Sequence, residues 1–360
     1  MVNISQDKQI SPYIVFFLIN SIQVGIGVLG FQRVVAEKAG YDGWISVLLA
    51  GLSTHLVVIV LFQLAKTGGG DLVEVHRYVF GKWLGHALSL IFCLYLSLIA
   101  LNILRNYIEV IQVWLFPKLN PLFFSFLFLV LVYYIVSSGF RVVTGVAFFG
   151  VMLPAYLALT FLYTLGYSDF RNFLPIWDHD LMSILSSAMK MSLTYLGYET
   201  LLIYYPFIKN GRISQKWAHL SLATTTLFYL FLTIITFAYF SEEQLKKVVW
   251  ATLSLWKIVE MPFVERFEYI GIANWCLVIL PNVCLFIWCA SRIIKRTTGF
   301  RQRRALIVIL CLIFVSVYFI QTREQINRLN DIAGNIGLYI NYVYFPLLLG
   351  LLLLVKKVKK

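Results

Sequence analysis

SIQVGIGVLGFQ, residues 21–32, places three glycines within six positions of a run that otherwise has the composition of a membrane helix. Each glycine costs about 1 kcal/mol relative to alanine in a helix interior. No proline or polar cluster marks the end of a segment here, and a helix that only crossed a bilayer would have no reason to carry this cost. The stretch therefore predicts that a membrane helix is interrupted around Gly25, Gly27 and Gly30.

The composition of the whole chain is that of an integral membrane protein. Of the 360 residues, 60% are hydrophobic and only 13% are charged, and the mean hydropathy is +0.81. A soluble domain is nearer half apolar and a quarter charged. Apolar stretches of about twenty residues, each long enough to cross a hydrocarbon layer of about 30 Å, recur throughout. We expect an all-α polytopic membrane protein that forms a single membrane domain over residues 1–360.

The hydropathy of the chain predicts ten membrane-spanning helices. Their predicted bounds are 12–36, 43–65, 84–115, 119–137, 142–167, 183–208, 216–240, 268–294, 304–321 and 335–355. An even number of spans places both termini on one side of the membrane. The predicted loops on that side carry most of the Lys and Arg residues, including the KKVKK ending at 356–360. The positive-inside rule therefore predicts that both termini are cytoplasmic.

The net charge of +13 is explained by this topology and by attraction to anionic lipids. Binding to nucleic acid would need a soluble basic domain with aromatic platforms, and the predicted loops are too short to form one. The five cysteines and five histidines show no C-x-x-C, H-x-x-H or H-E-x-x-H spacing. We therefore expect no metal site, no cofactor and no nucleic-acid partner.

A second glycine lies at a matching place in the other half of the chain. YLGYET, residues 195–200, has Gly197 at its centre, about as far into the sixth span as Gly25 lies in the first. The two spans cross the membrane in opposite directions, and such paired interruptions indicate a transporter-type site at the membrane midplane. The sequence thus predicts a five-plus-five inverted repeat, over 12–167 and 183–355, with broken helices 1 and 6. The alternative is that the glycines serve only close packing between helices.

Buried polar residues supply the chemistry of the candidate site. Glu199 lies near the centre of the sixth span, where a carboxylate needs a cavity, a partner or a proton. It has three possible roles: capping the N–H groups of the unwound segment, binding a ligand amine, or taking up a proton. Asn102 in the third span and Asn282 in the eighth, next to Pro281, are amides that either face the site or bond between helices.

Two further features concern the ends of the spans. Arg105 and Glu109 stand four residues apart on one face of the third span, so we expect them to pair with each other. Segment 241–267 alternates charged and aromatic residues at helical spacing, which predicts a surface helix over the extracellular mouth. This helix would either pack as a lid or dock a partner.

Several motifs occur in a fixed order along the chain. From the N-terminus, they are the GIG break at 25–27, GKWLG at 81–85, LGYE at 196–199 followed by Pro206, and W-A-T-L-S…E-R-F-E across 250–268. Together with the ten spans, they resemble the B subunits of spore nutrient-germinant receptors. That family belongs to the amino acid–polyamine–organocation transporter superfamily. The resemblance covers nearly the whole chain, and the combination of motifs carries it rather than any single one.

This resemblance implies a LeuT-like fold of five plus five helices in the spore inner membrane. It implies a small nutrient ligand, often an amino acid, bound where the first and sixth helices unwind. It also implies two partners, a membrane-attached A subunit and a C-subunit lipoprotein, with germination triggered by ligand binding. The predicted ligand-binding residues are Gly25, Ile26, Gly27, Gly30, Ile99, Asn102, Leu196, Gly197, Glu199, Pro281 and Asn282. Some relatives place small hydroxyl residues at the last two positions, which leaves the ligand's identity open.

Two functions are compatible with these features. The leading interpretation is a germinant receptor subunit, in which a bound nutrient stabilises one conformation that partner subunits detect. The alternative is a secondary active amino acid transporter, a symporter working alone, with Glu199 as its proton site. The sequence does not separate them, because fold does not determine function. No nucleophile, base and orienting group occur together at usable spacing, so we expect no enzyme and no catalytic residues.

Overall fold

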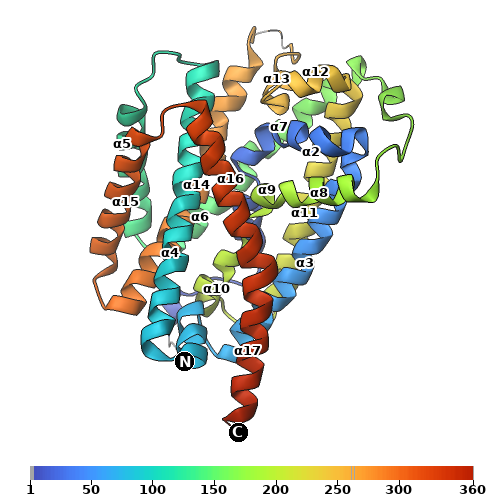
Figure 1. The fold of residues 1–360 in the computed structure, drawn as a ribbon. Coiled ribbons are helices and arrows are strands. Elements are labelled where there is room, and N and C mark those ends of the chain that lie inside the picture. Colours follow the sequence, from blue (N-terminus) through green and yellow to red (C-terminus); the bar gives the residue numbers. More distant parts are fainter. Residues whose placement is uncertain (1–3, 261, 263, 360) are drawn as a thin grey trace.

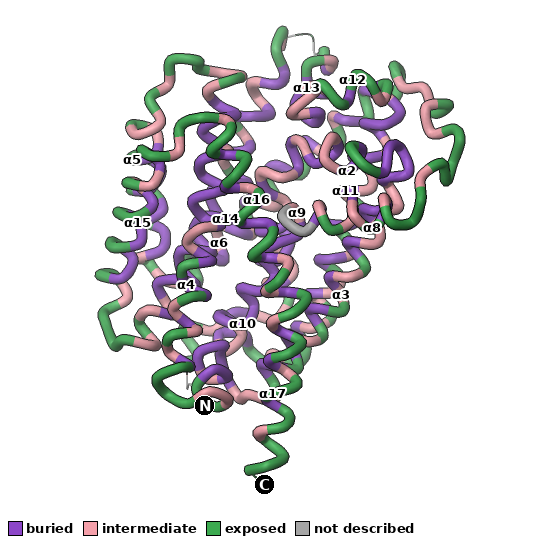
Figure 2. The backbone as a smooth tube through the Cα atoms, in the orientation of Figure 1, coloured by how far each residue is buried: buried purple, intermediate pink, exposed green. Residues whose placement is uncertain are grey.

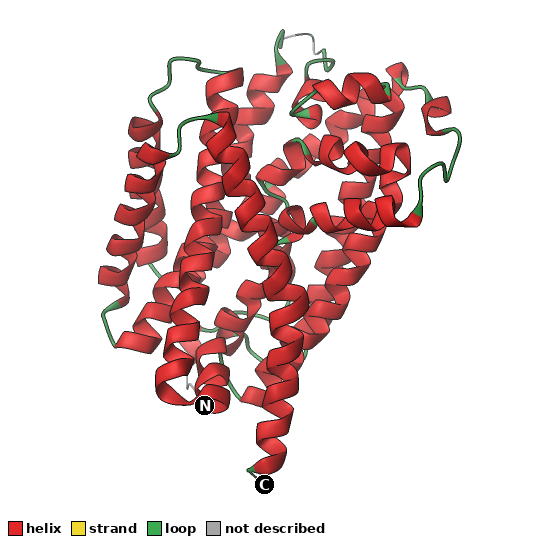
Figure 3. Ribbon diagram, viewed as in Figure 1, coloured by secondary structure: helices red, strands yellow, loops and turns green. Residues whose placement is uncertain are grey.

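The computed structural model describes residues 4–260, 262 and 264–359. The described residues form a bundle of helices. Near one end of the bundle, an isolated β-bridge pairs Ile10 with Ile208. Both termini lie at that same end of the bundle (Figure 1), which we call the terminal face; the other end is the opposite face. Figure 3 shows that helices make up most of the chain and that a long irregular connection lies at one side of the bundle.

The helices follow the order of the predicted spans. The α-helices are α1 (Ile14–Gln23), α2 (Phe31–Ala39), α3 (Gly43–Gly68), α4 (Leu72–Trp114), α5 (Pro121–Ser137), α6 (Phe140–Met152), α7 (Leu157–Thr160), α8 (Leu181–Lys190), α9 (Ser192–Tyr195), α10 (Leu201–Tyr204), α11 (Ser214–Tyr239), α12 (Glu242–Lys247), α13 (Ala251–Trp256), α14 (Phe267–Thr298), α15 (Gln302–Phe319), α16 (Arg323–Tyr339) and α17 (Phe345–Val358). Short 3₁₀ segments that matter below are η2 (Ile26–Leu29), η5 (Phe161–Tyr167) and η7 (Tyr198–Thr200), and η9 (Ile340–Tyr344) is a π-helical turn.

The predicted all-α membrane fold is confirmed. In the described part of the chain, seven helical stretches are long and apolar enough to cross a membrane, and α1 and α5 are shorter apolar helices. The count of ten spans stays a prediction, because the first and sixth spans are divided into short helices on either side of Gly25 and Gly197.

The third span differs from its prediction, 84–115, because the helix that contains it begins earlier. Gly81 has a φ of 77°, in the left-handed region that favours glycine, and it turns residues 72–80 away from the axis of α4. A Cβ on Gly85 would lie 2.7 Å from the carbonyl oxygen of His76, so residues 72–80 fold back against the following turn. We call residues 72–80 the terminal arm. Hydropathy does not identify it as part of a span because it carries charged side chains.

The helices pack in pairs that join the two predicted halves. α4 lies along α14, α3 along α11, and α5 along α15. Each pair combines helices from corresponding positions of 12–167 and 183–355, which supports the predicted inverted repeat; its boundaries stay a prediction. Figure 2 shows buried residues concentrated along α4 and α14 and exposed residues on α5 and α15. The central pair α4–α14 therefore forms the wall against which the broken helices lie.

The pairing expected between Arg105 and Glu109 is wrong. Arg105 Nε donates to the carbonyl oxygen of Ile320 at 2.5 Å, and its Nη2 donates to that of Gln321 at 3.0 Å. Glu109 instead accepts a hydrogen bond from Arg323 at 2.7 Å. Arg105 thus fastens α4 to the connection before α16, and Glu109 fastens it to the first residue of α16. Tertiary packing offers them carbonyl and guanidinium partners that helical spacing alone does not reveal.

Segment 241–267 forms two short helices, α12 and α13, instead of the single surface helix predicted; its residues 261 and 263 lie outside the described residues. All residues of α13 except Ser254 are buried, and Thr252 Oγ1 donates to the carbonyl oxygen of Val28 at 2.7 Å. Figure 1 places α12 and α13 at the opposite face. The segment packs on the bundle as expected for a lid, and docking of a partner on its outer side stays a prediction.

The connection between η5 and α8, residues 168–180, is anchored by Asp42 in the turn between α2 and α3. The buried carboxylate accepts the backbone N–H groups of Trp177 and Asp178 at 2.7 Å and that of His179 at 3.0 Å. A carboxylate is stable in this position because three donors replace the water it has lost. The anchor fixes an otherwise irregular connection to the corner where the first span ends.

Replacing Asp42 with alanine should lower the free energy of unfolding by about 1–3 kcal/mol, because three buried N–H donors lose their acceptor. The measurement is denaturant unfolding of the purified protein in detergent. The matched control is Glu37→Ala, which removes a carboxylate that is 63% exposed and pairs with Lys190 in an exposed ion pair; it should change stability by less than about 1 kcal/mol. Equal losses in the two variants would reject the anchoring role.

Candidate functional site

The first span is interrupted where its glycines predict. α1 ends at Gln23, and Gly25 separates it from the 3₁₀ segment η2 and from α2. The backbone of Gly25 has φ −131° and ψ −143°, so the chain leaves the helical path there. A Cβ on Gly25 would lie 2.6 Å from Nδ2 of Asn282. The glycine is therefore required for the close approach of α1 to α14.

The sixth span is also interrupted at its predicted position. α9 ends at Tyr195, and Gly197 has a φ of 118°, which L side chains rarely adopt. A Cβ on Gly197 would lie 2.7 Å from Cγ1 of Ile22, and one on Gly27 would lie 3.1 Å from Cγ2 of Thr194. The two interruptions therefore lie side by side. Close contact and local unwinding occur together here, so the packing explanation and the broken-helix explanation of the glycines are both partly correct.

Side chains replace the helical hydrogen bonds lost at the two interruptions. The Tyr229 hydroxyl of α11 donates to the carbonyl oxygen of Gln23 at 2.7 Å, and Trp275 Nε1 of α14 donates to that of Gly25 at 3.3 Å. Gln23 Nε2 donates in turn to the carbonyl oxygen of Tyr195 at 2.9 Å, which ties the first interruption to the second. Unpaired peptide groups are costly in a membrane interior, so these bonds stabilise the unwound geometry.

Glu199 is fully buried directly after the second interruption. Its Oε2 accepts the N–H of Gly197 at 2.8 Å, and its Oε1 accepts the Tyr95 hydroxyl of α4 at 2.7 Å. Of the three roles left open for this carboxylate, capping the unwound segment is the one observed. Tyr95 is a site residue that sequence reasoning missed. The available signal was its position seven residues before Asn102, two turns away on the same face of the third span.

Asn282 lies on α14 opposite the first interruption, and it is fully buried. Among the described residues, neither its Oδ1 nor its Nδ2 has a hydrogen-bond partner. The preceding Pro281 packs in the other direction, since a Cβ on Gly150 of α6 would lie 2.7 Å from its Cγ. The structure thus brings Asn282 to Gly25, as predicted, while Pro281 shapes the contact between α14 and α6.

Three predicted residues lie at the edges of the interruptions. A Cβ on Gly30 would overlap the carbonyl oxygen of Val249, so Gly30 packs beneath the chain that leads into α13. Leu196 packs against α16, where a Cβ on Gly337 would overlap its side chain. Ile26 begins η2 and is half-buried. Contact with a ligand stays a prediction for all three.

On α4, Ile99 is buried and Asn102 belongs to a ladder of amides. Asn106 Nδ2 donates to the Asn102 side-chain oxygen at 2.8 Å and to that of Asn330 on α16 at 2.9 Å. Of the two alternatives for Asn102, hydrogen bonding between helices is therefore present, as a network of side-chain amides that joins α4 to α16. Whether Asn102 and Ile99 also touch a ligand stays a prediction.

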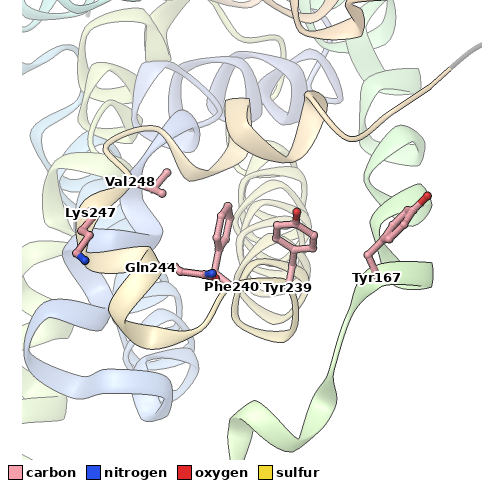
Figure 4. Close-up of a pocket in the computed structure, with 6 residues that line it drawn as sticks. All are labelled: Tyr167, Tyr239, Phe240, Gln244, Lys247 and Val248. Atoms are coloured by element: carbon pink, nitrogen blue, oxygen red, sulfur yellow. The ribbon is translucent and has the colours of Figure 1, made fainter.

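One pocket lies apart from the candidate site, and another lies beside it. One, of about 610 Å³, lies at the opposite face and is lined by Tyr167, Tyr239, Phe240, Gln244, Lys247 and Val248. Figure 4 shows these side chains at the junction of α11 and α12 and, for Tyr167, on the segment that faces it. None of the predicted ligand-binding residues lines this pocket. The other, of about 220 Å³, is lined in part by Asn20, Val24 and Trp275. Because Trp275 bonds to Gly25, this second pocket adjoins the candidate site.

A pair of histidines is the nearest approach to a metal site. The Nδ1 atoms of His55 on α3 and His219 on α11 lie 2.8 Å apart, with their rings parallel. Two imidazoles are fewer ligands than the three or four that protein zinc sites use. Within the described residues, no group of three or more His, Cys, Asp or Glu side chains is placed to hold a metal.

Replacing Gly197 with alanine should destabilise the protein by about 1–3 kcal/mol, because the backbone there is left-handed and the added methyl group meets Ile22. The measurement is thermal or denaturant unfolding in detergent. Gly145→Ala on α6 is the matched control, since a Cβ there meets nothing within 4 Å, and it should leave stability unchanged or raise it slightly. An unaffected Gly197 variant would contradict the geometry described for the second interruption.

Comparison with known proteins agrees with this architecture. The family model described as "Spore germination protein" matches residues 9–326. The chain is 45% identical over 348 residues to spore germination protein GerQB of Bacillus cereus, with 97% of each chain covered. It is 30% identical over 265 residues to spore germination protein B2 of Bacillus subtilis (strain 168), with 72% of this chain and 71% of that protein covered.

Two solved transporter structures share the fold. MhsT in complex with L-phenylalanine has a TM-score of 0.59 at 15% identity, with 96% of this chain and 98% of that chain covered. A Na⁺-coupled sialic acid symporter in a substrate-bound outward-open state has a TM-score of 0.68 at 13% identity, with 97% and 79% covered. At these identities the likeness concerns the fold alone, and it confirms the LeuT-like class. From the family match and the two relatives, we conclude that the chain belongs to the spore germination protein family, the family of germinant-receptor B subunits that its motifs resemble.

Proposed function

We propose that this protein is the nutrient-binding subunit of a spore germinant receptor. It lies in the spore inner membrane with both termini, and thus the terminal face, on the cytoplasmic side. It binds a small solute, which we propose is an amino acid, and signals germination together with partner subunits. One observation carries the proposal: two broken helices meet beside the fully buried amide of Asn282, which has no partner in the described part of the chain. Family membership supports the role in germination.

The proposed ligand pose uses the polar groups at the interruptions. The carboxylate of the amino acid binds N–H groups between Gly25 and Gly30, where a short helix begins. Its amine lies near the carbonyl groups of Leu196 and Gly197, with Glu199 close by. Its side chain contacts Ile99 and Asn282. A buried amide without a partner costs about 1–3 kcal/mol, so a polar ligand group that pairs with Asn282 would gain binding free energy.

The signal in this proposal is a shift of population between two conformations. A ligand that binds one conformation 100-fold more tightly moves the equilibrium by about 2.7 kcal/mol. Helix α13 is suited to report this shift, because its Thr252 accepts a hydrogen bond from Gln32 at 2.7 Å and donates one to the carbonyl oxygen of Val28. A change at the first interruption therefore changes the position of α13.

The proposed partners are the A-subunit membrane protein and the C-subunit lipoprotein of a receptor complex. Anionic lipids are a further proposed partner at the terminal face. Lys356 and Lys357 are exposed at the end of α17, and Lys360 of the same KKVKK cluster lies outside the described residues. Each such side chain near an anionic leaflet contributes about 1 kcal/mol of attraction. In this proposal the protein is a receptor subunit and has no catalytic residues.

Replacing Gly25 with valine should abolish the nutrient response while leaving membrane insertion intact. The branched side chain would occupy the position of the Asn282 amide, which lies 2.6 Å from where a Cβ would be. Spores carrying the variant are exposed to single L-amino acids, and germination is followed as the fall in optical density. Immunoblotting of the inner membrane checks insertion. The control is Gly145→Val, which has open space at its Cβ; normal germination of the Gly25 variant would show that the site is misplaced.

A secondary active amino acid transporter is the alternative function. Its support is the fold shared with a symporter, together with a carboxylate, Glu199, buried at the broken helix. The purified protein in liposomes is tested for uptake of radiolabelled L-amino acids. We expect no saturable uptake. Saturable uptake that Glu199→Gln abolishes, and that the exposed-carboxylate control Glu37→Gln preserves, would favour the transporter and reject the receptor as a protein that acts by sensing alone.

A further inference from the structure

One π-helical turn, Ile340–Tyr344, divides the last predicted span into α16 and α17. The N–H of Phe345 donates to the carbonyl oxygen of Ile340, five residues earlier instead of four. Pro346 follows, and it has no N–H to donate to the carbonyl oxygen of Tyr342, so regular α-helix is disfavoured here. A π-helical turn contains one residue more than an α-helical turn, and such turns are frequent at functional sites.

The π-helical turn begins next to the second interruption. On the preceding turn of α16, Gly337 provides the space that the Leu196 side chain occupies. The Asn341 amide donates to the carbonyl oxygen of Gly337 at 2.9 Å and faces the Glu199 carboxylate. The start of the turn is therefore held by residues of the candidate site.

The π-helical turn ends against the terminal arm, residues 72–80. The Tyr344 hydroxyl lies 2.6 Å from Nε2 of His76, and the other ring nitrogen of His76 lies 2.8 Å from the hydroxyl of Ser89. His76 is fully buried, so its two hydrogen-bond partners determine how its ring is oriented. The end of the turn is therefore held by residues of the terminal face.

A column of aromatic rings on α4 also joins the start of α17 to the candidate site. Phe92 lies between Phe345 and Tyr95, with ring centroids 6.0 Å and 5.6 Å away. The Tyr95 hydroxyl donates to Glu199. A rotation of α17 would therefore disturb Phe92, and through it the support of the Glu199 carboxylate.

The geometry points to a register switch in the last span: Ile340–Tyr344 converts from π-helix to α-helix when the candidate site changes state, and Tyr344 and His76 pass the change to the terminal arm. Loss of the extra residue from the turn rotates α17 by about 100° and moves it by about 1.5 Å along its axis. Tyr344 then leaves His76, and the arm is released. Tyr344 and His76 are positioning residues in this scheme. Its link to nutrient sensing rests on the proposed function.

The first test measures the rotation directly and needs no nutrient. Single cysteines at positions 347–354, in a chain with the exposed Cys311 changed to serine, are spin-labelled in the full-length protein in nanodiscs. Oxygen accessibility then reports which positions face lipid; in the structure, Leu347 and Leu351 are exposed and Leu348 and Leu352 are buried. Pro346→Ala restores the missing N–H and should rotate this pattern by about 100°, which corresponds to a shift of one residue along the helix. Leu347→Ala, next to the proline on the exposed face, is the matched control for the labels at 348–354 and should leave their pattern unchanged.

The second test measures the link to germination. Tyr344→Phe removes the hydroxyl that contacts His76, and Tyr339→Phe makes the same change on a side chain that is 64% exposed. Spores carrying each variant are exposed to a dilution series of every L-amino acid that germinates the wild type. We expect Tyr344→Phe and Pro346→Ala to shift the half-maximal concentration by about tenfold, and Tyr339→Phe to leave it unchanged.

An unrotated accessibility pattern in the Pro346→Ala chain overturns the register switch. A rotated pattern with unchanged germination curves in both Pro346→Ala and Tyr344→Phe spores overturns its role in signalling. A wild-type chain that confers no response to nutrients rejects the proposed function, and the accessibility pattern still decides the switch in that case.

Discussion

A peptide group that loses its helical hydrogen bond inside a membrane has no water to replace it, and this constraint governs the centre of the protein. Here side chains supply the replacements. The carbonyl oxygens of Gln23 and Gly25 accept from Tyr229 and Trp275, and that of Val28 accepts from Thr252. These donors come from three different elements, α11, α14 and α13. The unwound segment of the first span is therefore not a flexible defect, because α11, α13 and α14 must keep their positions for the donors to stay in place.

The same constraint explains the position of Glu199. Its carboxylate would be costly at the middle of a membrane helix, yet it caps the N–H of Gly197 and accepts the Tyr95 hydroxyl, so both oxygens have donors. The carboxylate thereby joins α4 to the broken sixth span. A group held on two sides responds to displacement of either partner. This arrangement suits a protein in which binding must be detected, whereas free access of a proton would require one of the two bonds to open.

The centre is connected to both faces of the bundle. Towards the opposite face, the buried helix α13 contacts the first interruption through Thr252. Towards the terminal face, the last span contacts the second interruption at Leu196 and reaches the terminal arm at His76. A transporter fold thus contains the mechanical links that a receptor needs, since alternating access and signalling both require the two faces to respond to one central site. The fold is compatible with either use, and membership of the germination family is what favours signalling.

The amino-acid sequence by itself determined the class of fold and the place of the two interruptions. Hydropathy marks apolar helices because their length must match the bilayer, and glycine marks interruptions because its conformational cost is local and independent of the rest of the fold. Gly25 and Gly197 could therefore be located without coordinates. Asn282 could be found in the same way, since an amide in an apolar run signals a need for a partner whatever that partner is.

Only the tertiary structure decided which groups meet. Arg105 and Glu109 satisfy helical spacing, but each has a better partner before or within α16, so the local pairing does not form. Tyr95 lies on the same helical face as Asn102, but that signal is weak because a tyrosine in a membrane helix is ordinary, and its hydroxyl matters only because Glu199 lies 2.7 Å away. Contacts between residues a hundred positions apart depend on how helices cross, and hydrogen bonds are decided within fractions of an ångström. Periodicity and composition carry no information at that scale, which is why the fold could be read from the chain and the bonding of its centre could not.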